Sequence, residues 1–207
     1  MDKKIAICFY GQTRTANVLK ETYSNMPDID FFVSTWDDFN NKEVFSFCKD
    51  KEFINPRINQ FDNNTHRAAY LINRVNFLKS NYEINYRFIY DYVMWTRSEI
   101  GYNKNDLYEF FNKIENNDDI SIFSDIEKDK DNNFYLPADY SFFSSSHIFD
   151  IYATGYKNKA ILEKANLKNG GHNYHAYNII NNHLNVKQIT LNHIFQFNKR
   201  TKRTIDE

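Results

Sequence analysis

The sequence predicts a single α/β domain in which helices flank a mixed, mostly parallel sheet. Ile5 to Tyr10 is a continuous apolar run, which is typical of a strand covered on both faces. A short helical stretch, Thr15 to Met26, ends before Pro27 and leads to a second apolar run, Ile29 to Trp36. Two strands joined by one short helix indicate a βαβ unit, whose strands are parallel.

A long helix is predicted after the irregular, asparagine-rich segment 39–64, in which Phe53 to Phe61 is a possible short strand. Thr65 can serve as the N-cap of this helix. Its apolar residues recur at the spacing of one buried helical face, namely Ala68, Leu71, Ile72, Val75 and Leu78. The β-branched and aromatic segment Arg87 to Thr96 follows as a buried strand.

Shorter elements are predicted in the middle of the chain. Asn105 can cap a helix whose apolar face reaches Ile114, and Ile120 to Phe123 is a brief strand. The run Asp125 to Asn133 is charged and has no apolar period, so we expect a solvated loop there.

The last part of the chain is predicted to contain two helices followed by a strand. Ser144 to Ser146 can cap a helix that Gly155 interrupts, and Gly170-Gly171 precede the last helix. Ile189 to Phe197 then alternates between apolar and polar residues, as a half-buried strand does.

Composition excludes several classes of nucleotide-binding protein. The chain has 5 Gly and 3 Pro in 207 residues, and neither G-x-G-x-x-G nor G-x-x-x-x-G-K-[ST] occurs in it. A Rossmann fingerprint and a Walker A loop are therefore excluded, and a bound phosphate needs another device. Lysine and arginine total 26 against 27 acidic residues, so the net charge of -1 predicts no nucleic-acid partner.

The number of cysteines and the length of the apolar runs indicate the cellular compartment in which we expect the protein. Cys8 and Cys48 are too few for a disulfide framework, and Cys8 lies in an apolar run typical of a buried thiol. Ile5 to Tyr10 is shorter than a signal-peptide core or a membrane span. We therefore expect a cytoplasmic protein with no integral membrane segment, made of one domain at residues 1–198 and a basic C-terminal tail at 199–207.

Polar residues follow three of the predicted strands, at the edge where open α/β sheets bind ligands. They are Gly11, Gln12, Thr13 and Arg14 after the first strand, Asp37 and Asp38 after the second, and Arg97, Ser98 and Glu99 after the strand that ends at Thr96. This set would suit a nucleoside diphosphate held through Mg²⁺ or Mn²⁺, with an arginine sharing the phosphate charge. Two structural alternatives remain: Asp37 or Asp38 as an N-cap, and Arg97 with Glu99 as an internal ion pair.

Five segments, in chain order, carry a resemblance to a known group of proteins: IAICFYGQTRT, DIDFFVSTWDD, YDYVMWTRSEI, LPADYSFFSSS and GGHNYHAYNIINNHL. Over nearly its whole length the chain resembles small bacterial and viral glycosyltransferase-like proteins with a GT-A-type sugar-nucleotide-binding fold. The resemblance implies that Gln12, Thr13 and Arg14 hold the nucleotide and that Asp37 or Asp38 contacts the base or the ribose. It also implies that the Arg97-Ser98-Glu99 element holds Mn²⁺ or Mg²⁺ against the diphosphate.

Two positions depart from the pattern of these relatives. Glu99 stands where they usually have Asp, and Gly171-His172 stands where they often have Pro-Glu. His172, at the start of the last helix, could reach the metal or the sugar, as a C-terminal His does in some glycosyltransferases. Asp139 could be the general base that deprotonates the acceptor hydroxyl, or a turn residue, since it follows Pro137 and lies in the LPADYSFFSSS turn.

Other histidines and aromatic residues are expected to be structural for the most part. His175 and His183 share a helical stripe with His172, and His183 is expected to be a core or edge residue. Some aromatic side chains near the strand ends could stack on a base or a sugar ring, the candidates being Tyr10, Trp36, Trp95 and Tyr140.

The expected function is that of a metal-dependent glycosyltransferase. It would bind a nucleoside-diphosphate sugar and transfer the sugar to a glycan or glycoprotein acceptor, as in polysaccharide biosynthesis. Two alternatives remain open: a catalytically silent carbohydrate- or nucleotide-binding domain, and a nucleotidyltransferase.

Overall fold

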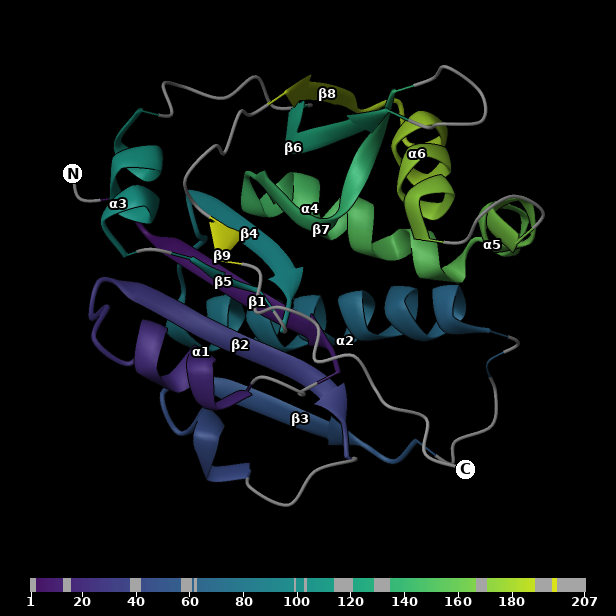
Figure 1. Ribbon diagram of the computed structural model, residues 1–207. Coiled ribbons are helices and arrows are strands. Elements are labelled where there is room, and N and C mark those ends of the chain that lie inside the picture. Colours follow the sequence, from purple (N-terminus) through teal and green to yellow (C-terminus); the bar gives the residue numbers. More distant parts are fainter. Residues whose placement is uncertain are drawn as a thin grey trace.

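The computed structural model in Figure 1 describes the backbone of most of the chain. The described residues are 3–12, 16–37, 42–56, 61, 63–98, 100–102, 104–113, 121–128, 135–166, 171–188 and 195–196. Within them a mixed sheet has helices packed on both faces, which confirms the predicted α/β class.

Seven of the described strands form one sheet, in the order β3-β2-β1-β4-β7-β6-β8. Their bounds are β1 Ile5–Gly11, β2 Ile29–Trp36, β3 Asp50–Ile54, β4 Tyr92–Arg97, β6 Ser121–Lys128, β7 Tyr135–Ser144 and β8 Asn185–Gln188. The first four in chain order are parallel, β7 is antiparallel to β4 and β6, and β8 is parallel to β6. A separate ribbon pairs β5 (Gly101–Tyr102) with β9 (Phe195–Gln196).

The helices divide between the two faces of the sheet. Their bounds are α1 Ala16–Tyr23, α2 Asn64–Tyr86, α3 Lys104–Lys113, α4 Ser146–Ala153, α5 Lys159–Asn166 and α6 Gly171–Asn181, with short 3-10 helices η1 Lys42–Phe45 and η2 Thr154–Lys157. One core joins the sheet to α2, α4, α5 and α6, and the other joins it to α1, η1 and α3. Among the described helices none is long and apolar enough to cross a bilayer.

Strand β1 lies between β2 and β4 in the parallel part of the sheet, and its side chains alternate between the two cores. Ala6, Cys8 and Tyr10 face the α2 side, whereas Ile7 and Phe9 face the α1 side. All five are at most 2% exposed, as expected of a parallel strand covered on both faces. The continuous apolar run that predicted this strand therefore reflects its position between two layers of helices.

Several predicted helix boundaries are wrong. The N-cap of α2 is Asn63, whose Oδ1 accepts the backbone N–H of His66 at 3.0 Å, whereas Thr65 is buried inside the helix. Asn105 likewise lies inside α3, and α1 stops at Tyr23. The Ser145 hydroxyl caps α4 through the N–H of Ile148, as predicted.

Other differences arise because pairing between distant strands decides the structure. Residues 125–128 of the predicted loop belong to β6, and the rest of that loop, 129–133, lies outside the described part. Residues 136–144 of the LPADYSFFSSS segment belong to β7, so the predicted turn is a strand there. β3 begins at Asp50, earlier than Phe53, and β4 begins at Tyr92, later than Arg87. Of the last predicted strand, residues 195–196 form β9 and residues 189–194 lie outside the described part, whereas β8 and α5 had no predicted counterpart.

Two helices end in the left-handed conformation without a glycine. Arg87 (φ +57°) ends α2 and His183 (φ +53°) follows α6. Beyond His183, Leu184 N–H donates to Ile179 O at 3.0 Å and His183 N–H donates to Ile180 O at 3.1 Å, the pattern of a Schellman motif. In this glycine-poor chain, residues with a Cβ carry the strain that glycine usually relieves.

Replacing His183 with glycine is expected to stabilise the protein. The imidazole is exposed, so little packing is lost, and relief of the left-handed strain should raise the free energy of unfolding by about 0.5–1 kcal/mol. Urea denaturation of the wild type, His183→Gly and His183→Ala measures this. An alanine variant as stable as the glycine variant would contradict the explanation.

Candidate functional site

The carboxyl ends of three neighbouring parallel strands meet at one edge of the sheet. In register, Gly11 of β1 lies beside Thr35 of β2, and Tyr10 of β1 lies beside Arg97 of β4. We call residues 11–12, 35–37 and 97–98 the carboxyl edge. Loops at such an edge are where open α/β sheets bind ligands.

Hydrogen bonds fix the chain at this edge. The Thr35 hydroxyl donates to Gly11 O at 2.6 Å, and Ser98 N–H donates to Tyr10 O at 2.7 Å. The Ser98 hydroxyl donates to Gln12 O at 2.5 Å. The segment after β1 is thereby held to both neighbouring strands, and its position is set before any ligand binds.

Gly11 is needed here for its backbone conformation. Its φ is +107°, a region that residues with a Cβ rarely adopt. A Cβ at this position would lie 3.8 Å from Ser98 Oγ, so space is available and the conformation is the constraint. β1 ends at this residue, directly before the predicted phosphate-binding residues.

The predicted donor-binding residues fall into two groups. Gln12 and Asp37 are exposed at the carboxyl edge, Arg97 is half-buried, and Gly11 completes the described set. The other predicted residues lie outside the described part of the chain: Thr13, Arg14, Asp38 and Glu99.

Asp37 is the described residue at this edge that could contribute to a metal site, and its carboxylate is already paired. Its Oδ1 lies 2.8 Å from Lys42 Nζ, and its backbone N–H donates to Ile54 O at 2.7 Å. Mg²⁺ and Mn²⁺ take several oxygen ligands. Among the described residues no group of three or more His, Cys, Asp or Glu could hold a metal ion, so these residues do not fit a metal site without Glu99 or Asp38.

The two predicted catalytic residues lie on elements whose backbone is described. Asp139 belongs to strand β7, two residues before Ser141, which pairs with Thr96 near the end of β4. Because β7 and β4 are antiparallel, Asp139 lies toward the carboxyl edge, on a strand and not on a turn. His172 is the second residue of α6. The side chains of both lie outside the described part.

The positions of the other histidines and of the strand-end aromatic residues can be compared with their expected roles. His175 is 3% exposed and its Nδ1 shares a hydrogen bond with the Tyr152 hydroxyl, whose pKa burial raises well above its usual value. His183 is exposed in the helix cap, so its expected core or edge position is wrong. The expectation that strand-end aromatics could stack on a ligand is also wrong for those whose side chains are buried: Tyr10, Trp36 and Trp95. The Tyr140 side chain lies outside the described part.

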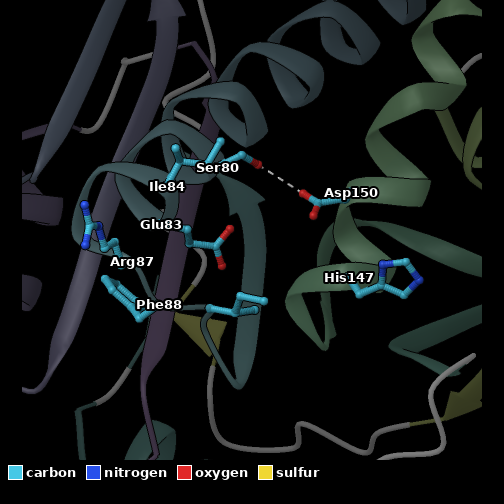
Figure 2. A pocket seen from close by; sticks show the side chains of 8 residues that line it. Ser80, Glu83, Ile84, Arg87, Phe88, His147 and Asp150 are labelled. Atoms are coloured by element: carbon cyan, nitrogen blue, oxygen red, sulfur yellow. Dashed lines mark hydrogen bonds between the residues drawn. The ribbon is translucent and has the colours of Figure 1, made fainter.

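A buried ionic network, which the sequence did not predict, lies at the opposite end of the sheet. Lys79 is fully buried, and its Nζ donates to Ser146 Oγ and lies 3.1 Å from Glu83 Oε2 and 2.9 Å from Asp150 Oδ1. The Ser146 hydroxyl in turn donates to Glu83 Oε1 at 2.6 Å, as does Tyr90 N–H at 2.9 Å. Figure 2 shows Glu83 and Asp150 facing each other across the end of α2 and the start of α4.

This network holds α4 against α2 and is not suited to nucleophilic catalysis. Ser146 is 1% exposed, and its proton is directed to Glu83, not to an approaching substrate. The Lys79 ammonium is held by two carboxylates and the Ser146 hydroxyl, so its donors are used in contacts between α2 and α4. In the sequence, Lys79 and Glu83 look like an ordinary solvated i, i+4 pair, so no local signal revealed their burial.

Breaking the network should be costly. Lys79→Met leaves Glu83 buried without its cation and should lower the free energy of unfolding by about 3–5 kcal/mol. The matched control is Lys159→Met, which removes an exposed i, i+4 pair with Glu163 and should cost at most about 0.5 kcal/mol. Similar small changes in both variants, measured by urea denaturation, would show that the buried pair does not hold the two helices together.

Comparisons with known proteins give a likeness at the level of fold. No protein-family model and no curated protein matches the sequence. A crystal structure of the glycosyltransferase GlyE from Streptococcus pneumoniae is similar with a TM-score of 0.50 at 12% identity, over 91% of this chain and 46% of that chain. The apo form of GlyE gives a TM-score of 0.47 at 11% identity, over 90% and 45%. The chain thus spans less than half the length of these structures, and it shares a glycosyltransferase-like fold.

Proposed function

We propose that this protein binds a nucleoside-diphosphate sugar at the carboxyl edge and transfers the sugar to a glycan or protein-linked acceptor. The observation that carries the proposal is the cross-linked end of β2, β1 and β4, where Gly11 turns the chain outward between Thr35 and Ser98. The glycosyltransferase-like fold supports it, because the corresponding edge of open α/β sheets is where ligands bind.

The diphosphate would be held by side chains instead of a glycine-rich loop. Gln12, Thr13 and Arg14 follow the fixed turn at Gly11, and Arg97 ends the neighbouring strand. An arginine can donate two parallel hydrogen bonds to a phosphate and share its charge as the nucleoside diphosphate departs. We assign the phosphates to these residues, and the base or ribose to Asp37 or Asp38.

A divalent cation, Mn²⁺ or Mg²⁺, is part of the proposal and depends on Glu99. The described carboxylate at the edge, Asp37, is paired with Lys42, so Glu99 would supply the main ligand. Such an ion would neutralise charge on the diphosphate.

Proton transfer at the acceptor is assigned to Asp139 or His172. A group that removes the proton of the attacking hydroxyl must be within hydrogen-bond reach of it. The position of Asp139 on β7, toward the carboxyl edge, is compatible with this role.

A silent binding domain is the second candidate, and the Asp37–Lys42 ion pair is the observation that favours it. An acid already neutralised by lysine holds a metal poorly, and without the ion the diphosphate would be a poor leaving group. Such a protein would bind the sugar nucleotide without transferring the sugar.

Thermal unfolding in the presence of UDP-, GDP- and TDP-sugars tests the binding proposal. A ligand that binds only the folded state, at about 100 times its Kd, stabilises by about 2.7 kcal/mol, which should raise Tm by roughly 5–10 °C. Arg97→Ala should reduce this rise, and Ile180→Ala, at an exposed residue of α6, should not. No rise with any sugar nucleotide would refute the proposal. A rise without donor hydrolysis or transfer would favour the silent domain, and a preference for nucleoside triphosphates a nucleotidyltransferase.

The metal dependence has its own test. Glu99→Ala should remove the part of the Tm rise that requires Mn²⁺ and leave the metal-free part in place, because the nucleotide keeps its arginine contacts. An unchanged response to Mn²⁺ would exclude Glu99 as a metal ligand.

A further inference from the structure

Exposed apolar side chains gather at the C-terminal end of α2. Of the large hydrophobic residues that are exposed in the described part of the chain, four lie between positions 77 and 89, and one, Ile180, lies apart on α6. Ile84 and Ile89 are each 73% exposed, and Phe77 and Tyr86 are 48% and 64% exposed. Phe77 and Ile84 are seven residues apart and so lie on one face of the helix, away from its buried face. Large exposed apolar patches mark interaction surfaces.

A groove of about 720 Å³ runs beside this patch, between the end of α2 and the start of α4. Ile84, Phe88 and Ile89 form its apolar wall, and His147 and Asp150 lie on the other side (Figure 2). We call Ile84, Arg87, Phe88 and Ile89 the α2 tip. It lies at the amino end of β4, away from the carboxyl edge, so its role is independent of the proposed sugar-nucleotide site.

Cations border the apolar residues of the α2 tip. Arg87 is exposed, and Lys4 Nζ, also on an exposed residue, lies 4.0 Å from the centre of the Phe88 ring. Asp91 is exposed nearby, but its carboxylate accepts the backbone N–H of Lys4 at 2.8 Å. In a chain with a net charge of -1, this end combines cations with protruding isoleucines. Apolar side chains flanked by lysine and arginine are the composition of surfaces that lie on bilayers.

The backbone at the α2 tip is held in place, so the isoleucines cannot easily turn inward. Phe88 N–H donates to Glu83 O at 3.1 Å, and Tyr90 N–H donates to the Glu83 carboxylate at 2.9 Å. Asp91 N–H donates to Lys4 O at 3.0 Å. The buried network around Lys79 therefore fixes the segment that presents Ile84 and Ile89 to the outside.

We propose that the α2 tip docks onto the surface of a bilayer that contains anionic lipid. Ile84 and Ile89 would enter the boundary between headgroups and acyl chains, while Arg87 and Lys4 contact the anionic headgroups. A second copy of the chain is a poorer partner, because a two-fold contact through this patch would bring the same cations of both copies together.

Vesicle co-sedimentation tests the proposal with four proteins: the wild type, Ile84→Asp/Ile89→Asp, Arg87→Glu and Ile180→Asp. The wild type should bind vesicles of phosphatidylcholine with roughly 30% phosphatidylglycerol, and bind pure phosphatidylcholine at least about fivefold more weakly. The double variant should lose about tenfold in partitioning, Arg87→Glu a few-fold, and Ile180→Asp nothing, because Ile180 is almost as exposed but lies elsewhere. Unchanged Tm values would show that the variants fold.

Three results would overturn the proposal. The first is no binding of the wild type to either kind of vesicle, and the second is equal binding of the wild type and the double variant. The third is a wild type that is dimeric in solution and a double variant that is monomeric, since the patch would then face a second copy.

Discussion

Burial of β1 on both faces is the constraint on which the rest of the structure depends. A strand with Cys8 on one face and Phe9 on the other, both 0% exposed, requires a layer of helices on each side. Helices that cross over a face of the sheet connect strands that run parallel, and both neighbours of β1, which are β2 and β4, pair with it in parallel. Three chain segments consequently leave the sheet at one edge, and the proposed sugar-nucleotide site is a consequence of that arrangement.

Scarcity of glycine shapes how this edge could bind a ligand. With no glycine-rich cradle in the sequence, a single turn at Gly11 is held by hydrogen bonds that the Thr35 and Ser98 hydroxyls donate to the carbonyl oxygens of Gly11 and Gln12. The proposed contacts to phosphate are therefore side chains, which can differ in number and charge between related proteins. The same scarcity leaves Arg87 and His183 in left-handed conformations, so this chain accepts strain at helix ends in two places within the described residues.

The sequence predicted those elements whose formation depends on residues close together in the chain. β1, β2, the core of α2 and the start of α4 follow from apolar runs, helical spacing and a serine cap, and the polar strand ends do meet at one edge. The start of β6 was predicted, but its charged second half and β7 could not be, because residues such as Glu127 are held in a strand by pairing with another segment. The burial of Lys79 depends on Asp150 and Ser146, more than sixty positions away, and Trp95 is buried by α4 although it stands near a strand end.

The two ends of the sheet are assigned different roles, and one measurement separates them most directly. Hydrogen–deuterium exchange, with and without the sugar nucleotide that raises Tm most, reports which backbone amides the ligand protects. We expect slower exchange in peptides that cover residues 10–12 and 96–100, and unchanged exchange at residues 80–90. Protection confined to residues 80–90 and 146–150 would instead place the ligand in the groove beside the α2 tip and contradict the account.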